Sequence, residues 1–380
     1  PTSLKSLASL TMGDISMAND TKPRLGLIAR MDNTGLGVQT HALYKFLKPH
    51  RTYVIDLTEI NKDMGKISAN FPERYPDGLF ISGFPSSEQM DQMLEDIDVL
   101  FTVEIPYGYE LFALARARGV RTILQYNYEF LDYLRNPDLP LPDLLLAPSI
   151  WHFEDVREFT EKHYAKLRYL QPPVDRKAIP FRQRTEANHF VHVAGHKTFM
   201  DRNGTEVVMG ALQYIRSDIK VTVHCQSSEL AQEITTKYTI PDNVDFELIS
   251  TEIKEYTDIY NNPNYDVLLL PRRYGGLSLQ LNEALSSGMP VIMPNVSPNN
   301  TILPPATLIN VEDSVSIQTR TSIDCYEISP KVLATKIEQL HANKQLVTNL
   351  STNADLIADR ISWTNMLPKY QRIIEEICQV

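Results

Sequence analysis

Two adjacent glycines and one glutamate within residues 265–300 have the types and spacing of a site for a phosphorylated ligand. Gly275 and Gly276 allow backbone angles that a side chain disfavours, and they come just before a predicted helix over residues 277–287. The first turn of a helix has free N–H groups that bind anions. Gln280 and Glu283 follow Gly276 at helical spacing, so we expect all three on the face nearest the loop.

The residues on both sides of this helix predict that it connects two strands of a buried parallel sheet. Val267 to Leu270 are all apolar, as a strand covered on both faces requires. Gly288 is suited to end the helix, and Pro290 to Met293 begin the next strand. The carboxylate of Glu283 would then accept hydrogen bonds from both hydroxyls of a ribose, so we interpret the segment as a sugar-nucleotide site.

The segment resembles the nucleotide-binding signature of GT-B glycosyltransferases, in particular the retaining family 4 type. That signature has two glutamates separated by seven residues and a small-residue, Gly, Pro, Val ending. This sequence matches it at Glu283, Ala284, Gly288, Pro290 and Val291. The first glutamate, which lies near the transferred sugar in the family, is replaced by Gly275. The resemblance implies that Glu283 binds the donor ribose and that Gly275, Gly276 and Leu277 at the helix start bind the donor diphosphate.

A second glycine-containing loop follows the first predicted strand, Leu25 to Arg30, and leads into a helical pattern. In the family, backbone N–H groups of this loop face the donor phosphates and the acceptor. The resemblance implies donor contacts at Gly35 and Gly37, and acceptor contacts at Asp32 and Thr34.

Two other interpretations of this loop stay open. Its glycines also suit a tight strand-to-helix turn that binds nothing. A dinucleotide-binding fingerprint would have only its first two glycines here, with Thr40 at the third position, and only Asp56 supplies an acid at the end of the next strand.

Cationic residues follow the first strand of the second half, where the family binds the diphosphate with an arginine and a lysine. His196 stands at the arginine position and Asn203 at the lysine position, while Lys197 and Arg202 lie one residue away. We expect Lys197 and Arg202 to neutralise the leaving diphosphate, with His196 also at the donor. The alternative is a solvated basic turn.

Two further arginines, Arg272 and Arg273, directly precede the glycine pair. One of them can face the anion while the other faces solvent or a carboxylate. The conformation of the loop decides between them, and we favour Arg273.

Acidic and amide residues follow two predicted strands of the first half. Asn127 and Glu129 come after the strand at 122–125, and Glu104 follows the strand at 99–103. Because the carboxyl ends of parallel strands face the cleft, we expect Asn127 and Glu104 to bind the acceptor and Glu129 to bind a hydroxyl or act as a base. The alternative for Glu129 is an acid stabilised at a helix start. Retaining transfer of this type is usually described as front-face, with the donor phosphate helping to deprotonate the acceptor, so that no protein base is obligatory.

Alternating strand and helix patterns predict an α/β protein with two Rossmann-like domains that face a cleft, the GT-B architecture. The consecutive prolines Pro172 and Pro173 mark the linker between them. We expect a flexible leader at 1–22, an acceptor domain at 23–170, a linker at 171–188, and a donor domain with C-terminal helices at 189–380. In this fold the last helix often crosses back to the first domain.

Composition limits the classes of function. The 380 residues include 37 basic and 47 acidic ones, and a net charge of −10 disfavours broad, nonspecific polyanion binding. Three widely spaced cysteines predict a reduced, cytoplasmic setting, and no run of about 18 apolar residues predicts a membrane span. The nine histidines show no metal-ligand spacing, so we expect a metal-independent enzyme without a permanently bound cofactor.

The resemblance implies transfer of a sugar, with retention, from a nucleoside-diphosphate sugar, most often a UDP-sugar in the family. The acceptor would be a hydroxyl of a glycan or glycolipid, or of a modified DNA base. A GT-B-fold epimerase or phosphorylase is one alternative, although no lysine is singled out as a pyridoxal phosphate ligand. A noncatalytic nucleotide-sugar binding protein is another, which the missing first glutamate keeps open.

Overall fold

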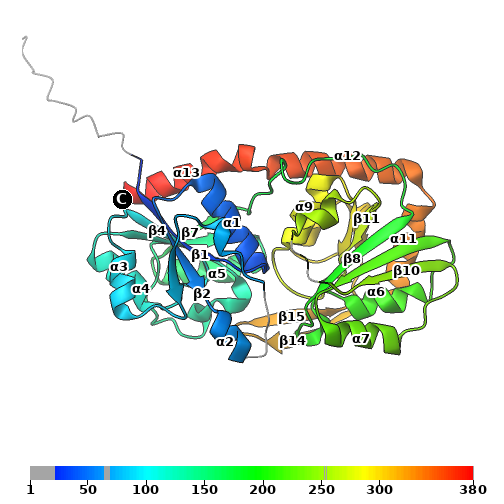
Figure 1. Cartoon of the computed structure of the whole chain (residues 1–380), viewed down its shortest axis with the longest axis horizontal. Coiled ribbons are helices and arrows are strands. Elements are labelled where there is room, and N and C mark those ends of the chain that lie inside the picture. The colour runs from blue at the N-terminus through cyan, green and yellow to red at the C-terminus, as the bar shows by residue number, and fades with distance from the viewer. Residues whose placement is uncertain (1–21, 64–68, 252, 254, 380) are drawn as a thin grey trace, which may run out of the picture.

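The computed structural model describes residues 22–63, 69–251, 253 and 255–379. It contains two α/β domains side by side, each built on one parallel sheet (Figure 1). The leader expected at 1–22 lies outside the described residues except for Lys22.

The N-terminal domain has a seven-stranded parallel sheet of order β3-β2-β1-β4-β5-β6-β7. Its central strands are apolar and buried on both faces, because helices cover both sides of the sheet. The strands are β1 (Leu25–Arg30), β2 (Arg51–Asp56), β3 (Leu79–Ser82), β4 (Val99–Glu104), β5 (Arg121–Tyr126), β6 (Leu144–Ala147) and β7 (Lys166–Tyr169). The helices are α1 (Gly35–Leu47), α2 (Thr58–Asp63), α3 (Ser87–Met93), α4 (Glu110–Ala117) and α5 (Phe153–Lys162).

The C-terminal domain repeats this design with a six-stranded parallel sheet of order β10-β9-β8-β11-β12-β13. Its strands are β8 (His189–Gly195), β9 (Ile219–Cys225), β10 (Val244–Ile249), β11 (Val267–Leu269), β12 (Val291–Pro294) and β13 (Leu308–Ile309). Its helices are α6 (Thr205–Leu212), α7 (Ser228–Lys237), α8 (Thr257–Asn261), α9 (Leu279–Ser287), α10 (Asn299–Ile302), α11 (Pro330–His341) and α12 (Lys344–Arg360).

Both sheets reverse their strand order beside the first strand of the domain. The reversal lies between β1 and β4 in one sheet and between β8 and β11 in the other. Loops at the carboxyl ends of the strands diverge at such a switch point and leave a crevice that binds ligands. The topology therefore predicts where each domain contributes to a site.

An antiparallel hairpin, β14 (Asp313–Gln318) and β15 (Ser322–Glu327), extends from the C-terminal domain and lies between the two domains (Figure 1). Ile317, Ile323 and Cys325 pack in one hydrophobic cluster with side chains of the N-terminal domain, among them Tyr128 and Trp151. The sequence analysis did not predict this hairpin. Its burial against the N-terminal domain gives the two domains a second contact beside the linker.

The chain crosses between the domains twice at neighbouring positions. The linker segment at Val174 forms a bridge with Ser362, and the Val174 N–H donates to the Ile361 carbonyl at 2.9 Å. After this second crossing, α13 (Trp363–Cys378) packs its apolar face on the N-terminal core, beside α1 (Figure 1). The range 189–380 expected for the donor domain thus includes a final helix that is buried against the other domain.

No helix in the described part of the chain combines the length and the hydrophobicity that a membrane span needs.

Candidate active site

A cleft of about 950 Å³ lies between the domains, where both parallel sheets end. Loops after β1, β4 and β5 line one wall, and loops after β8, β9 and β11 line the other. Of the expected site residues, the cleft is lined by Thr34, Gly35, Glu104, Asn127, His196, Lys197, Arg202, Gly276 and Leu277. The remaining ones, all in the described part of the chain, lie outside the lining: Asp32, Gly37, Glu129, Arg273, Gly275 and Glu283.

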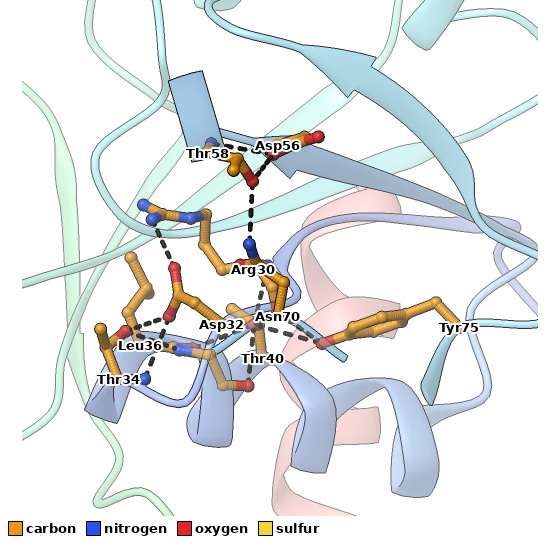
Figure 2. Close-up of polar contacts among 10 residues, drawn as sticks. Arg30, Asp32, Thr34, Leu36, Thr40, Asp56, Thr58, Asn70 and Tyr75 are labelled. Atoms are coloured by element: carbon orange, nitrogen blue, oxygen red, sulfur yellow. Dashed lines mark hydrogen bonds and ion pairs between the residues drawn. The ribbon is translucent and has the colours of Figure 1, made fainter. Parts of the chain in front are cut away.

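Asp32 shapes the first glycine loop from behind instead of facing the cleft. Its carboxylate is 2% exposed, pairs with Arg30 and accepts a hydrogen bond from the Thr34 backbone N–H at 3.1 Å (Figure 2). Thr34 caps α1, because its hydroxyl accepts from the Gly37 N–H at 3.3 Å. A Cβ on Gly37 would lie 1.9 Å from the Asp32 carbonyl oxygen, so this turn requires glycine. The expected acceptor contact at Asp32 is therefore corrected: its charge is used inside the loop.

A neighbouring segment fixes the same loop from outside. The Tyr75 hydroxyl donates to the Arg30 carbonyl at 3.0 Å, and the Phe71 N–H donates to the Met31 carbonyl at 2.8 Å. Asn70 pairs with Asp32 in a β-bridge and donates from its side chain to the Thr58 hydroxyl (Figure 2). The face that Thr34 and Gly35 present to the cleft is thus held before any ligand binds.

Glu104 is presented to the cleft by a strained turn at the end of β4. Its φ is +69°, and the Ile105 N–H donates to the Val103 carbonyl at 2.8 Å, which is a γ-turn of the rare positive-φ kind. Burial and the nearby Glu129 raise the pKa of Glu104 to about 7. Among the described residues none forms a hydrogen bond or ion pair with this carboxylate, so it is available to a ligand.

Glu129 does not line the cleft, where we expected it to bind a hydroxyl or act as a base. It lies in a short 3₁₀ turn (Tyr128–Phe130), is 3% exposed, and pairs with Arg202 of the other domain. Arg202 lines the cleft and Glu129 lies behind it. Glu129 therefore positions the Arg202 guanidinium.

Lys197 lines the cleft, but its charge is compensated. The ammonium group pairs with Glu229 and Glu233, both on α7. These carboxylates raise the pKa of Lys197 and hold its amine on the surface of α7. His196 is exposed beside it at the cleft.

Of the two arginines before the glycine pair, Arg272 faces the cleft and the favoured Arg273 does not. Arg273 donates to the Tyr326 carbonyl at 3.0 Å and the Met200 carbonyl at 2.8 Å, which directs it toward the hairpin. Arg272 donates to the carbonyls of Tyr274 and Leu277, each at 3.0 Å. The preference for Arg273 was wrong, because the loop turns the second side chain outward.

The glycines after these arginines allow close approach of cations and of the opposite domain. Gly275 has φ +114°, and a Cβ there would lie 2.7 Å from Nη2 of Arg272 and 2.8 Å from Nη2 of Arg202. A Cβ on Gly276 would lie 2.8 Å from the Trp151 ring of the N-terminal domain. Where the family signature has its first glutamate, two guanidinium groups therefore flank a bare backbone.

Glu283 lies one helical turn into α9, which begins two residues later than expected, at Leu279. The carboxyl is 8% exposed and borders a separate cavity of about 40 Å³, beside Asp175 and Tyr256. Gln39 and Leu279 line both this cavity and the main cleft, so the two adjoin. Burial raises the pKa of Glu283 to about 7, and a hydrogen bond with Tyr260 acts in the opposite direction.

The sequence analysis missed several cleft residues that follow the same strands. Gln125 and Tyr126 end β5, and Trp151 follows β6. The rule that identified Asn127, a polar residue at the carboxyl end of a parallel strand, also applies to Gln125 and Tyr126.

No protein-family model matches the sequence, and no curated protein matches it. Solved structures are similar. Anabaena HepE in complex with UDP and glucose has a TM-score of 0.64 at 10% identity, covering 93% of this chain and 100% of that one. A glycosyltransferase from Rickettsia africae has a TM-score of 0.64 at 13% identity, covering 94% and 98%. Sucrose-phosphate synthase from Thermosynechococcus elongatus has a TM-score of 0.64 at 14% identity, covering 93% and 98%.

At such low identities the similarity concerns the fold. It extends over both domains and the cleft between them, as the coverage of each chain shows. The two facing Rossmann-like domains confirm the architecture expected from the sequence: this chain has the GT-B fold.

Proposed function

We propose that the protein transfers a sugar from a nucleoside-diphosphate sugar, with uridine as the nucleoside, to an acceptor hydroxyl. Similar structures support the choice of donor, since HepE was solved with UDP-glucose and the pneumococcal O-GlcNAc transferase GtfA with UDP and GlcNAc. The observation in this chain that carries the proposal is the environment of Arg272.

Arg272 is a cation at the cleft without a carboxylate partner among the described residues. Its Nε and Nη1 atoms bind two backbone carbonyls, which leaves Nη2 available beside Gly275. Burial and the neighbouring Arg202 lower the pKa of Arg272 to about 9, so it is still a cation at neutral pH. Two guanidinium groups and a single carboxylate, that of Glu129 paired with Arg202, leave a net positive site that a diphosphate would compensate.

The start of α9 adds to this site. The helix has no acidic residue in its first turn, and Ser278 at its N-cap makes no side-chain cap hydrogen bond. Gly276, Leu277 and Ser278 line the cleft at this point. Backbone N–H groups there, together with Arg202 and Arg272, suit the negative charge that the leaving diphosphate gains.

The remaining parts of the donor follow from this position. With the diphosphate at the start of α9, the ribose would reach the adjoining small cavity, where the Glu283 carboxylate can accept hydrogen bonds from both ribose hydroxyls. The sugar would lie toward the wall formed by Glu104 and Asn127.

In the transfer step, the acceptor oxygen bonds to the anomeric carbon while the bond from that carbon to the diphosphate oxygen breaks. The electron pair leaves with the diphosphate, and Arg202 and Arg272 stabilise it without a protein-bound metal. The proton of the acceptor hydroxyl passes to a phosphate oxygen, and the configuration is retained. This route needs no protein base, which agrees with the position of Glu129 behind Arg202.

The two adjacent arginines provide a matched test. Arg272→Gln should weaken binding of UDP about 10- to 100-fold, because a charge-assisted hydrogen bond is lost. Arg273→Gln should leave it within about twofold, because that side chain binds backbone carbonyls away from the cleft. Calorimetric titration with UDP measures both. Equal effects of the two substitutions would overturn the donor site.

Turnover distinguishes the proposal from the alternatives. Wild-type protein incubated with UDP-glucose that is labelled in its sugar should release UDP. The label should then be found either on an acceptor or in free glucose. Recovery of only an isomeric UDP-sugar would indicate an epimerase. Tight UDP binding without any UDP release, across a panel of UDP-sugars, would indicate a noncatalytic binding protein.

A further inference from the structure

The two walls of the cleft differ in charge. Of the described lining residues, the C-terminal domain contributes three cations, Lys197, Arg202 and Arg272. The N-terminal domain contributes one, Arg30, and its guanidinium is paired with the buried Asp32. The only acid that lines the cleft in this part of the structure is Glu104, on the N-terminal wall.

The backbone conformation at Glu104 is strained for any residue except glycine. A positive φ in a γ-turn strains a residue that has a Cβ, and such strain is found mainly at functional sites. The Thr102 hydroxyl donates to the Ile105 carbonyl at 2.8 Å, which holds the turn closed. The turn directs a carboxylate without a protein partner into the cleft.

The neighbouring strand adds polar groups that also lack partners. Glu104 is opposite Tyr126 in the parallel register of β4 and β5, and Val103 is opposite Gln125. Gln125 is 1% exposed and Tyr126 is 2% exposed, and both line the cleft. Both polar atoms of the Gln125 amide and the Tyr126 hydroxyl have no hydrogen-bond partner in the described structure. Buried polar groups are seldom left unpaired, so a polar ligand or water is expected there.

Aromatic side chains complete this wall. Tyr128, Phe130 and Trp151 line the cleft; Phe130 is half-buried, whereas Tyr128 and Trp151 are each 6% exposed and pack in the cluster with the hairpin. Aromatic rings offer apolar surface to the C–H groups of a sugar, while carboxylate and amide groups bind its hydroxyls. Among the described lining residues of this wall, the one cation, Arg30, is already paired, so a phosphate would find no unpaired cation on the N-terminal side.

We propose that the acceptor is an uncharged carbohydrate, with one hydroxyl bound by the Glu104 carboxylate and its ring near Phe130 of the N-terminal wall. This inference rests on the proposed transferase function and adds the class of acceptor to it. A nucleic acid or a phosphorylated sugar would bring anionic groups against Glu104 in a partly enclosed cleft, where like charges repel more strongly than in water.

Pairs of acceptors that differ only in charge test whether the acceptor is an uncharged carbohydrate. The probe is release of UDP from UDP-glucose, measured with mono- and oligosaccharides, with their phosphorylated counterparts, and with duplex DNA that contains 5-hydroxymethylcytosine. With an uncharged saccharide, the rate of UDP release should be at least tenfold higher than the rate without an acceptor. It should also be at least tenfold higher than the rate with the phosphorylated counterpart of that saccharide. Faster release with a phosphorylated sugar or with DNA overturns the inference, and so does a panel in which no uncharged saccharide raises the rate.

Two substitutions at Glu104 separate binding from folding. Glu104→Gly removes the carboxylate and relieves the backbone strain, so its melting temperature should equal or exceed that of the wild type. Glu104→Gln keeps the size of the side chain. In both variants KM for the saccharide should rise at least tenfold while the Kd for UDP stays within about twofold. An unchanged KM in both would refute the role of Glu104.

The same measurements distinguish failure of this inference from failure of the proposed function. If the wild type binds UDP and hydrolyses UDP-glucose slowly but prefers anionic acceptors, only the acceptor class is wrong. If it neither binds UDP nor releases it from UDP-glucose, the transferase function itself is wrong, and the acceptor proposal with it.

Discussion

Replacement of Glu283 by glutamine tests the ribose assignment, because folding and ligand binding should respond in opposite directions. The carboxyl is 8% exposed and borders the cavity of about 40 Å³ beside the cleft. Its pKa is about 7 in the folded chain and 4.5 in the reference state. A buried carboxyl group with a raised pKa is unfavourable for folding once it ionises, yet the ionised form is the better acceptor for ribose hydroxyls.

The effect on stability follows from the two pKa values of Glu283. Below pH 4.5 the carboxyl is protonated in both states and contributes no pH dependence. Between pH 4.5 and about 7 the unfolded chain loses its proton first, so the free energy of unfolding decreases as pH rises. One pKa unit corresponds to about 1.4 kcal/mol, and the full interval therefore to about 3 kcal/mol. Glu283→Gln should be more stable than the wild type by up to this amount above pH 7.

Donor binding should change in the other direction. UDP-glucose is the suitable ligand, because its phosphodiester groups do not titrate between about pH 5 and 8. In the wild type, affinity should fall by up to tenfold per pH unit below about 7 as Glu283 takes up a proton. In Glu283→Gln, affinity at pH 8 should be at least about tenfold weaker, since charge-assisted hydrogen bonds are lost, and its pH dependence should be smaller than that of the wild type, with Glu104 left to titrate near pH 7 at the sugar.

Chemical denaturation and calorimetric titration between pH 5 and 8 measure the two effects. Tyr260→Phe is the matched control, because it keeps the carboxylate but removes the hydrogen bond that lowers its pKa. In this variant the midpoint of the pH dependence should move upward while binding at high pH is retained. If UDP-glucose binds equally well and with the same pH profile to the wild type and to Glu283→Gln, Glu283 is a structural residue and the ribose assignment is refuted.

Two other substitutions test the walls of the cleft. Glu129→Gln removes the carboxylate that positions Arg202, so UDP should bind more weakly by about 1 kcal/mol, or about fivefold, and unchanged or tighter binding in a titration would contradict the positioning role. Gly37→Ala should lower the free energy of unfolding by about 3 kcal/mol, because its Cβ would lie 1.9 Å from the Asp32 carbonyl oxygen. Gly35→Ala is its control in denaturant titrations, with 3.9 Å to the nearest atom, and equal losses in both would disprove the steric explanation.

Much of the fold could be predicted because its signals are local. The buried strands of both sheets are short apolar runs, and β1 has the bounds that the sequence indicates. The β14–β15 hairpin was missed because only its inward residues are apolar, such as Ile317 and Ile323, and the surface that covers them belongs to the other domain. The burial of α13 on the N-terminal core likewise depends on a partner surface far away in the sequence.

The candidate site could be predicted as a set of loops, but not as a set of side-chain directions. The sequence analysis identified the loop of Glu104 by the strand-end rule and the loops of Arg202 and Gly276 by resemblance to the family, and all three residues line the cleft. It could not tell that Arg273 turns outward, because carbonyl groups of Met200 and Tyr326 bind its guanidinium.

A local sequence motif also does not show whether a charged side chain is paired with an opposite charge. Lys197 is paired with two glutamates of α7 that follow it by more than 30 residues, and Glu129 is paired with Arg202 across the domain boundary. Whether a charged group is available to a ligand depends on such partners, and they come from the tertiary structure.

The hairpin β14–β15 joins the loop of Arg273 to the loop of Glu129 through hydrogen bonds to backbone carbonyls. On one side, the Tyr326 N–H donates to the Arg273 carbonyl at 2.8 Å. On the other, the Thr321 hydroxyl donates to the Tyr128 carbonyl at 2.9 Å, and the Arg320 N–H donates to the Glu129 carbonyl at 3.2 Å. A rotation of the domains must therefore either break the contacts at Tyr128 and Glu129 or move the hairpin. Because Glu129 also pairs with Arg202, opening of the cleft on this side would separate this cleft arginine from its carboxylate. The geometry of the proposed donor site thus depends on the contact between the two domains as well as on the loops that carry Arg202 and Arg272.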